Sequence, residues 1–125
     1  MRLSIITLAI ILALGCDAKD KAQQEGVVER LDAARVEHAG LEILRLRQSV
    51  DLYRIEKLEC PNGVQDLVAA QIEPKPIEDP WGNEFVFTCP GEHDEVDIVS
   101  PGKDGKLGTA DDIQSWTLSP RAGDR

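Results

Sequence analysis

The chain has 125 residues, enough for one small domain behind a leading segment, and 23 acidic against 14 basic side chains give it a net charge of −9. This acidic balance argues against nucleic-acid binding, which needs a basic face, and it does not suit anionic lipid surfaces. Few aromatic residues are available, so a core of this size is expected to be only marginally stable without further help.

The beginning of the chain has the features of a bacterial export signal. After a basic start, residues 3–14 are almost wholly apolar, but this run is too short to span a bilayer of about 30 Å. Gly15 followed by Cys16 resembles the cleavage site of bacterial lipoproteins, in which the cysteine is lipidated and becomes the mature N-terminus. We therefore expect a signal peptide over 1–15, a lipid anchor on Cys16 on the periplasmic side of a membrane, and a polar linker over 16–22. The alternative is a conventional signal peptidase site with an incidental cysteine.

Residues 23–57 lack proline and carry apolar side chains at helical spacing, which predicts one long helix. Its apolar stripe consists of Val36, Ala39, Ile43, Leu46, Val50 and Tyr53. The stripe could face a neighbouring subunit, but for residues 43–53 we favour packing on a sheet. Val27, Val28 and Leu31 are too far along the helix to reach a short sheet, so we expect them to make a partner or coiled-coil contact.

A second, short helix is expected after Pro61, because the residue before a proline disfavours the helical conformation and ends the first helix. Asn62 is expected to cap this helix, which would cover 63–70. Its inward-facing residues are expected to be Val64, Leu67 and Val68.

The rest of the chain has the alternation and turn residues of a small antiparallel sheet. The expected strands cover 84–88, 95–100 and 113–118. Trp81, in a tight turn over 79–83, is expected to anchor on the core rather than to bind a ligand. The fold class is therefore α+β: a long N-terminal helix, a short second helix and a three-stranded antiparallel sheet. This domain is expected to span 23–120, with a disordered tail over 121–125.

The loop between the second and third strands combines three aspartates, Asp104, Asp111 and Asp112, with several glycines. Calcium takes six to eight oxygen ligands, and glycines let a loop curl so that backbone carbonyls also point inward. The spacing does not match the helix-loop-helix calcium motif. The alternative is an ordinary solvated hairpin turn, since Asp-Gly pairs are common in turns.

Cys60 and Cys89 remain once Cys16 is lipidated, and in an oxidising compartment such a pair more often forms a disulfide than a reactive centre. The catalytic alternative is a Cys60 nucleophile with His93 as its base, but no element supplies an oxyanion hole. Zinc is disfavoured because the ligand spacing of known zinc sites is missing. We therefore expect no enzyme, no small-molecule substrate and no nucleic-acid partner.

Five segments, in unbroken order, closely resemble the C-terminal domain of the major pseudopilins, protein G, of type II secretion systems. These segments are 79–83, 90–93, 96–98, 102–105 and 111–113, and the resemblance runs from about Leu41 to Trp116. It implies a pseudopilin-like fold, partners among other pseudopilins or secretion-system components, and calcium in the loop. The implied calcium ligands are the side chains of Asp104, Asp111 and Asp112 and the backbone carbonyls of Pro101, Lys106 and Thr109.

The N-terminal sequence differs from the pseudopilin pattern. Members of the family have a Gly-Phe-type cleavage site, a glutamate shortly after it, and a long apolar segment that forms the filament core. The first 25 residues here have none of these. We therefore expect a calcium-stabilised pseudopilin variant that is held to a membrane by lipid. The alternative is a calcium-dependent periplasmic adaptor or binding lipoprotein that does not polymerise.

Overall fold

The computed structural model describes residues 17–118, with side chains from residue 23 onward, and it divides into two units at Ala34. Helix α2 (Asp17–Lys57) contributes its first part to the first unit and the remainder to the second. The helix thus includes residues 17–22, which the sequence analysis assigned to a linker. That expected helix start was too late, because this stretch is rich in alanine and lysine, both good helix formers.

The buried stripe of α2 lies in the second unit and matches the expected one at five of six positions. The buried residues are Ala39, Ile43, Leu46, Val50 and Tyr53. The expectation was wrong for Val36, whose side chain is 48% exposed. The strands that cover α2 have only two to four residues each, so they bury only a few turns of the helix. In the first unit, Val27, Val28 and Leu31 are about half exposed.

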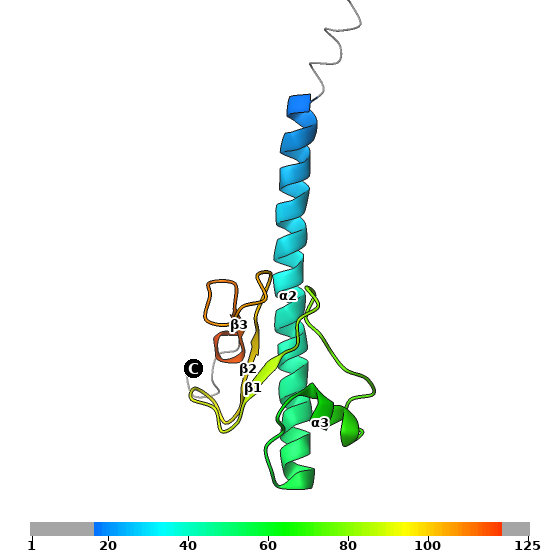
Figure 1. The fold of residues 1–125 in the computed structure, drawn as a ribbon, viewed down its shortest axis with the longest axis vertical. Coiled ribbons are helices and arrows are strands. Elements are labelled where there is room, and N and C mark those ends of the chain that lie inside the picture. Colours follow the sequence, from blue (N-terminus) through cyan, green and yellow to red (C-terminus); the bar gives the residue numbers. More distant parts are fainter. Residues whose placement is uncertain (1–16, 119–125) are drawn as a thin grey trace, which may run out of the picture. The chain divides into compact units, whose positions relative to one another are not determined.

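Helix α3 (Val64–Ala69) lies near the C-terminal end of α2 (Figure 1). It buries Val64 and Leu67, as the sequence predicts. The expected capping by the Asn62 side chain is wrong, because the N-cap residue is Gly63 and no side chain caps the helix there. Instead the Asp66 carboxylate, inside the helix, accepts a hydrogen bond of 2.8 Å from the backbone N–H of Asn62. An acidic side chain in the first helical turn also suits the partial positive charge there.

The sheet is antiparallel and its order is β1-β2-β3. Its strands are β1 (Val86–Thr88), β2 (Asp97–Ser100) and β3 (Ile113–Gln114). All three strands are shorter than expected: the first two begin two residues later, and the third ends early because residues 115–117 form the 3-10 helix η1 (Ser115–Thr117). The buried hydroxyl of Ser115 accepts a hydrogen bond of 3.0 Å from the N–H of Ile98. A side-chain oxygen thus satisfies this strand donor, and the backbone is free to turn away.

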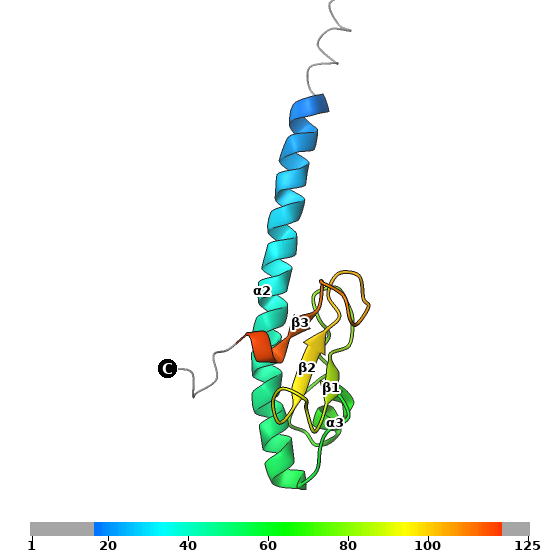
Figure 2. The ribbon, with the colours of Figure 1, turned by 90° about the vertical axis from the view of Figure 1, so that its left-hand side faces the viewer.

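The hydrophobic core lies between the sheet, α3 and the second-unit part of α2. Figure 2 shows the three strands alongside this part of the helix. The sheet and its flanks contribute Phe85, Val96, Ile98 and Ile113 to the core. Trp81 packs against this cluster, so its anchoring role is confirmed. The α+β fold class is therefore correct.

Several expectations concern parts of the chain outside the described residues. The signal peptide over 1–15, the lipidated Cys16 and the tail over 121–125 all lie there. Within residues 17–118, no helix has an apolar stretch of the length needed to cross a bilayer.

Candidate metal centre

The loop between β2 and β3 holds the three aspartates that the sequence analysis singled out. Gly102, Gly105 and Gly108 all have positive φ, between 67° and 82°, so the backbone curls at three points. At Gly102 there is a second constraint, because a Cβ there would lie 2.1 Å from the carbonyl oxygen of Asp111. Only glycine lets the two ends of the loop approach so closely.

The carboxylates of the loop accept hydrogen bonds from the loop's own backbone. Asp104 accepts from the N–H of Lys106 at 3.0 Å, and Asp111 accepts from the N–H of Asp104 at 3.2 Å. The bond from Lys106, followed by one from the Thr109 hydroxyl, lowers the pKa of Asp104 below its ordinary value of 3.8. Both carboxylates are thus held close to the backbone of the loop.

Asp112 differs from the other two aspartates. Its Oδ2 accepts a hydrogen bond of 2.7 Å from the N–H of Gly108, but its Oδ1 is buried and has no hydrogen-bond partner. A buried carboxylate oxygen without a donor is costly, and a cation is one way to satisfy it. Within residues 17–118, however, no three acidic, histidine or cysteine side chains are arranged to hold a metal by themselves. Backbone carbonyls would have to complete a metal site here.

A buried carboxylate next to the loop fixes the start of the loop. Asp79 Oδ1 accepts the N–H groups of Trp81 and Asn83, at 3.0 and 2.8 Å. Its Oδ2 accepts a hydrogen bond of 2.7 Å from the Ser100 hydroxyl. The Ser100 hydroxyl oxygen in turn accepts the N–H of Gly102 at 3.2 Å. The bonds of Asp79 within its own turn could have been predicted, because an aspartate before a Pro-x-Gly turn is a recognisable signal, but its bond to Ser100 could not. No comparable signal marks Ser100.

A second cluster lies in the connection between β1 and β2. The Asp97 carboxylate, 4% exposed, accepts the backbone N–H groups of Glu92, His93 and Asp94 at 2.9 to 3.1 Å. The His93 ring lies 3.1 Å from the same carboxylate and stacks on Trp116, with 3.8 Å between the ring centroids. His93, which was considered as a catalytic base, therefore serves to hold this connection together through Asp97 and Trp116.

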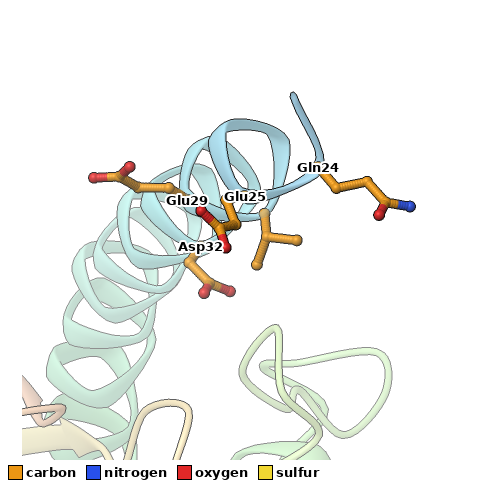
Figure 3. Close-up of a pocket in the computed structure, with 5 residues that line it drawn as sticks. Gln24, Glu25, Glu29 and Asp32 are labelled. Atoms are coloured by element: carbon orange, nitrogen blue, oxygen red, sulfur yellow. The ribbon is translucent and has the colours of Figure 1, made fainter. Parts of the chain in front are cut away.

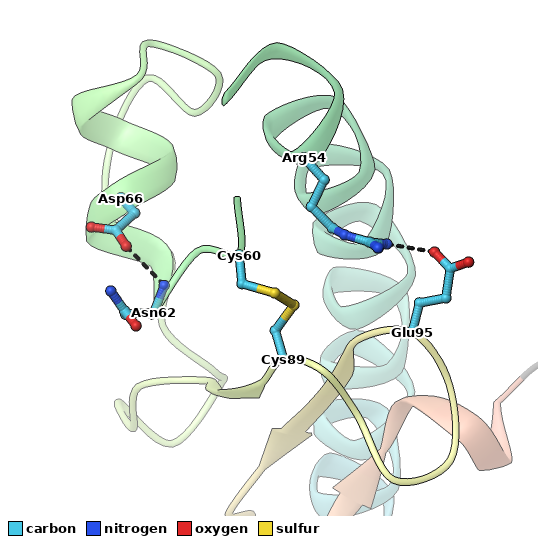
Figure 4. The surroundings of a disulfide bond; sticks show 6 residues. All are labelled: Arg54, Cys60, Asn62, Asp66, Cys89 and Glu95. Carbon is cyan, nitrogen blue, oxygen red and sulfur yellow. Dashed lines mark hydrogen bonds and ion pairs between the residues drawn. A yellow bond between two sulfur atoms is a disulfide. The ribbon is translucent and has the colours of Figure 1, made fainter. Parts of the chain in front are cut away.

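Cys60 and Cys89 form a disulfide with their Cα atoms 5.8 Å apart. Figure 4 shows it between the segment after α2 and the end of β1, with the Arg54–Glu95 ion pair nearby. With its sulfur in a disulfide, Cys60 has no free thiol to act as a nucleophile. The other histidine, His38, is largely exposed and lies 3.4 Å from Glu42 on the same helix.

The first unit presents a further hollow on its surface. Figure 3 shows its labelled side chains, Gln24, Glu25, Glu29 and Asp32, all projecting from α2. With Val28 they come from a single helix, and no other described element contributes to the hollow. This surface therefore lacks the converging groups of a binding site.

Comparison with known proteins gives a consistent result. Residues 26–116 match the family model described as Type II secretion system (T2SS), protein G. The chain is 33% identical over 119 residues to the type II secretion system core protein G of Klebsiella michiganensis, covering 82% of this chain and 75% of that protein. It is 35% identical over 97 residues to the protein of the same name from Escherichia coli strain K12, covering 64% and 66%.

A solved structure is also similar. The crystal structure of the major pseudopilin from the type 2 secretion system of enterohaemorrhagic Escherichia coli aligns with a TM-score of 0.61 and 30% sequence identity. The alignment covers 72% of this chain and 93% of that one.

Proposed function

Because this chain belongs to the type II secretion system protein G family, we propose that it acts as a structural subunit of type II secretion whose second unit is stabilised by calcium. The observation that carries the assignment is the match to the family model over residues 26–116. This range includes most of α2, the sheet and the β2–β3 loop. The function is mechanical rather than catalytic: the subunit presents a folded domain to other secretion-system components.

Two features of the β2–β3 loop support calcium binding. The loop offers three carboxylates and a curled backbone, a donor set that suits a hard cation. The Oδ1 atom of Asp112 is buried without a donor, and a cation would satisfy it. By resemblance to the family, Asp104, Asp111 and Asp112 would bind through side chains, and Pro101, Lys106 and Thr109 through carbonyls. The residues present therefore fit calcium.

Bound calcium would supply positive charge to a loop that otherwise concentrates like charges. Asp104 and Asp111 would exchange hydrogen bonds from the loop's N–H groups for contacts to the cation. The loop directly joins β2 to β3, so fixing it fixes the pairing of Ser100 with Ile113. In this way the cation would stabilise the edge of the sheet.

Calcium is expected to raise the melting temperature. At about 100 times its dissociation constant, a ligand that binds only the folded state adds roughly 2.7 kcal/mol. For a domain of about 100 residues this corresponds to a rise on the order of 10 °C. Asp111→Ala should lose most of this rise, whereas the control Glu56→Ala, which removes an exposed carboxylate from α2, should keep it. Circular dichroism melts in millimolar calcium and in chelator measure both.

Identical melting curves for the wild-type chain in calcium and in chelator would refute calcium binding. Magnesium serves as a second control. It gives up its water ligands reluctantly, so it should produce a much smaller rise than calcium at the same concentration.

We further propose that a lipid on Cys16 anchors the protein to a bacterial membrane, with the domain in the periplasm. The support is the apolar run that ends in Gly15-Cys16. Residues 16–125 contain 13 basic and 23 acidic side chains, since only Arg2 is removed, and so carry a net charge of −10. A domain with this charge has no electrostatic attraction to an anionic membrane surface, so attachment depends on the lipid.

Cys16→Ala is expected to move the protein from the membrane fraction to the soluble fraction or to leave it unprocessed. Intact mass spectrometry of the extracted wild-type chain should show a lipid-modified chain that begins at Cys16. A variant that is cleaved and fractionates like the wild type would exclude lipid anchoring.

Assembly with other pseudopilins is tested by affinity purification of the tagged chain after cross-linking in cells. Recovery of other pseudopilins of the secretion system supports a subunit role. Their absence, with the domain folded and membrane-attached, would instead favour a calcium-dependent periplasmic adaptor that does not polymerise.

A further inference from the structure

The turn before β1 reaches the β2–β3 loop through the side chain of Asn83. Its Nδ2 donates a hydrogen bond of 2.9 Å to the carbonyl oxygen of Gly102. The N–H of Gly105 donates to the same carbonyl at 3.1 Å. A Cβ at Gly105 would lie 3.1 Å from Asn83 Oδ1, so the amide packs closely against both glycines. These glycines flank Lys103 and Asp104, the beginning of the proposed cation loop.

Both polar groups of Gly102 are therefore held from outside the loop. Its N–H donates to the Ser100 hydroxyl, which donates to Asp79, and its carbonyl accepts from Asn83. In a trans peptide the N–H and the preceding C=O point in opposite directions. Because the N–H of Gly102 points to Ser100, the carbonyl of Pro101 must point away from Ser100. Ser100 and Asp79 thus fix the orientation of the Pro101 carbonyl.

We propose that Asn83 is a positioning residue for calcium in the β2–β3 loop. Its side chain sets the peptide plane that follows Gly102, whereas Ser100 and Asp79 set the plane that precedes it, and it thereby places the Asp104 side chain for the cation. This inference rests on the proposed function, because it requires the loop to bind calcium. Partners that orient metal ligands from outside commonly change affinity about ten- to a hundredfold when they are removed.

Removal of the Asn83 side chain should leave the turn itself intact. The backbone N–H of Asn83, not its side chain, donates to Asp79, and the N–H of Gly82 donates to the Asp79 carbonyl at 3.0 Å. The side chain is only half buried. We therefore expect the cation-free domain to fold as in the wild type, with the defect appearing when calcium binds.

The test measures calcium affinity and cation-free stability on the same full-length chain, purified in detergent and freed of cations. Isothermal titration with calcium should show a dissociation constant about ten- to a hundredfold higher for Asn83→Ala than for the wild type. The melting temperature in chelator should be unchanged. Asn83→Ser, which also removes the amide but leaves a residue common in turns, should behave in the same way and serves if Asn83→Ala fails to fold.

Gln65→Ala provides the matched control. Gln65 also uses a side-chain amide to bind this segment, since its Nε2 donates to Glu84 Oε1 at 3.1 Å, but that bond does not involve the loop. This variant should bind calcium with wild-type affinity.

Each remaining outcome counts against the proposal. Wild-type affinity in Asn83→Ala, or a lower melting temperature in chelator with unchanged affinity, means that Asn83 does not position the loop for calcium, while calcium binding itself stands. A wild-type chain that does not bind calcium removes the proposed calcium function and this inference together. The titration of the wild type separates the two failures.

Discussion

At the residue scale, Asp97 is the carboxylate whose surroundings most clearly control its charge. Burial acts to raise its pKa, but hydrogen bonds from the backbone N–H of Asp94 and from the ring and backbone of His93 outweigh it. The pKa is therefore held below its ordinary value of 3.8. Gly91 makes this arrangement possible, because a Cβ there would lie 2.8 Å from the Asp97 carboxyl carbon.

A lowered pKa in the folded state determines the direction of a pH effect. Ionised Asp97 stabilises the fold above its unfolded-state pKa, and this stabilisation is lost as the pH falls through the lower, folded-state value. We expect wild type to melt at a higher temperature than Asp97→Asn at about pH 5.5, below the usual histidine range, with the difference shrinking as the pH falls below about 4. Paired melting curves measure this. A difference that is constant with pH would show that the charge of Asp97 does not matter.

At the scale of elements, the two faces of α2 in the second unit can be compared directly. Ile43 is fully buried against the sheet, whereas Ile55, on the same helix, is 73% exposed. Ile43→Ala should destabilise the domain by about 2–5 kcal/mol, because it leaves a cavity in the core. The matched control Ile55→Ala should change stability by only about 0.5 kcal/mol or less. Urea denaturation measures both, and similar losses in the two variants would mean that the helix packs through a different face.

The spacing of apolar residues predicted most of these elements, because it shows which face of a helix or strand is buried. The stripe from Ala39 to Tyr53 and the inward residues of α3 follow directly from helical spacing. Strand ends were harder to predict. The pairing of β2 with β3 ends where the Ser115 hydroxyl, instead of a backbone carbonyl, accepts the N–H of Ile98, and no periodic pattern reveals this. Polar burial was also missed: Glu73 lies in a proline-rich connection but is buried and accepts from Arg45 and Ser49 of α2.

The same contrast holds for the candidate site. The three aspartates could be found from composition and glycine spacing, because acidic side chains and curled backbone lie together in one short loop. Asn83 and Asp79 could not be assigned to the site from the sequence. They contact the loop from a turn about 20 residues earlier, and only the pairing of β1 with β2 brings the two segments together.

At the scale of the whole second unit, the sheet is held at its two ends by different means. Thr88, next to the disulfide, pairs with Asp97, whereas Ser100 at the other end of β2 leads into the loop. A strand of four residues spans about 13 Å. The disulfide and the proposed cation loop are separated by about this distance and share no partner, so we expect them to contribute independently to stability.

Replacing both cysteines therefore gives a prediction for the unit. A Cys60→Ser/Cys89→Ser variant should lose about 3–4 kcal/mol, the chain-entropy value for a closed loop of about 30 residues. It should nevertheless keep the full calcium-dependent rise in stability. Denaturant titrations with calcium and with chelator measure both effects. If the rise disappears with the disulfide, the two ends are coupled.

The Cys60–Cys89 bond also closes the chain between these residues into a covalent ring. This ring contains α3 and the exposed stretch from Pro74 to Pro76. A periplasmic protease that cuts within the ring leaves the two halves of the subunit covalently joined, whereas a cut outside the ring releases a fragment. A single break in this exposed connection therefore leaves β1 linked to α2 through the disulfide.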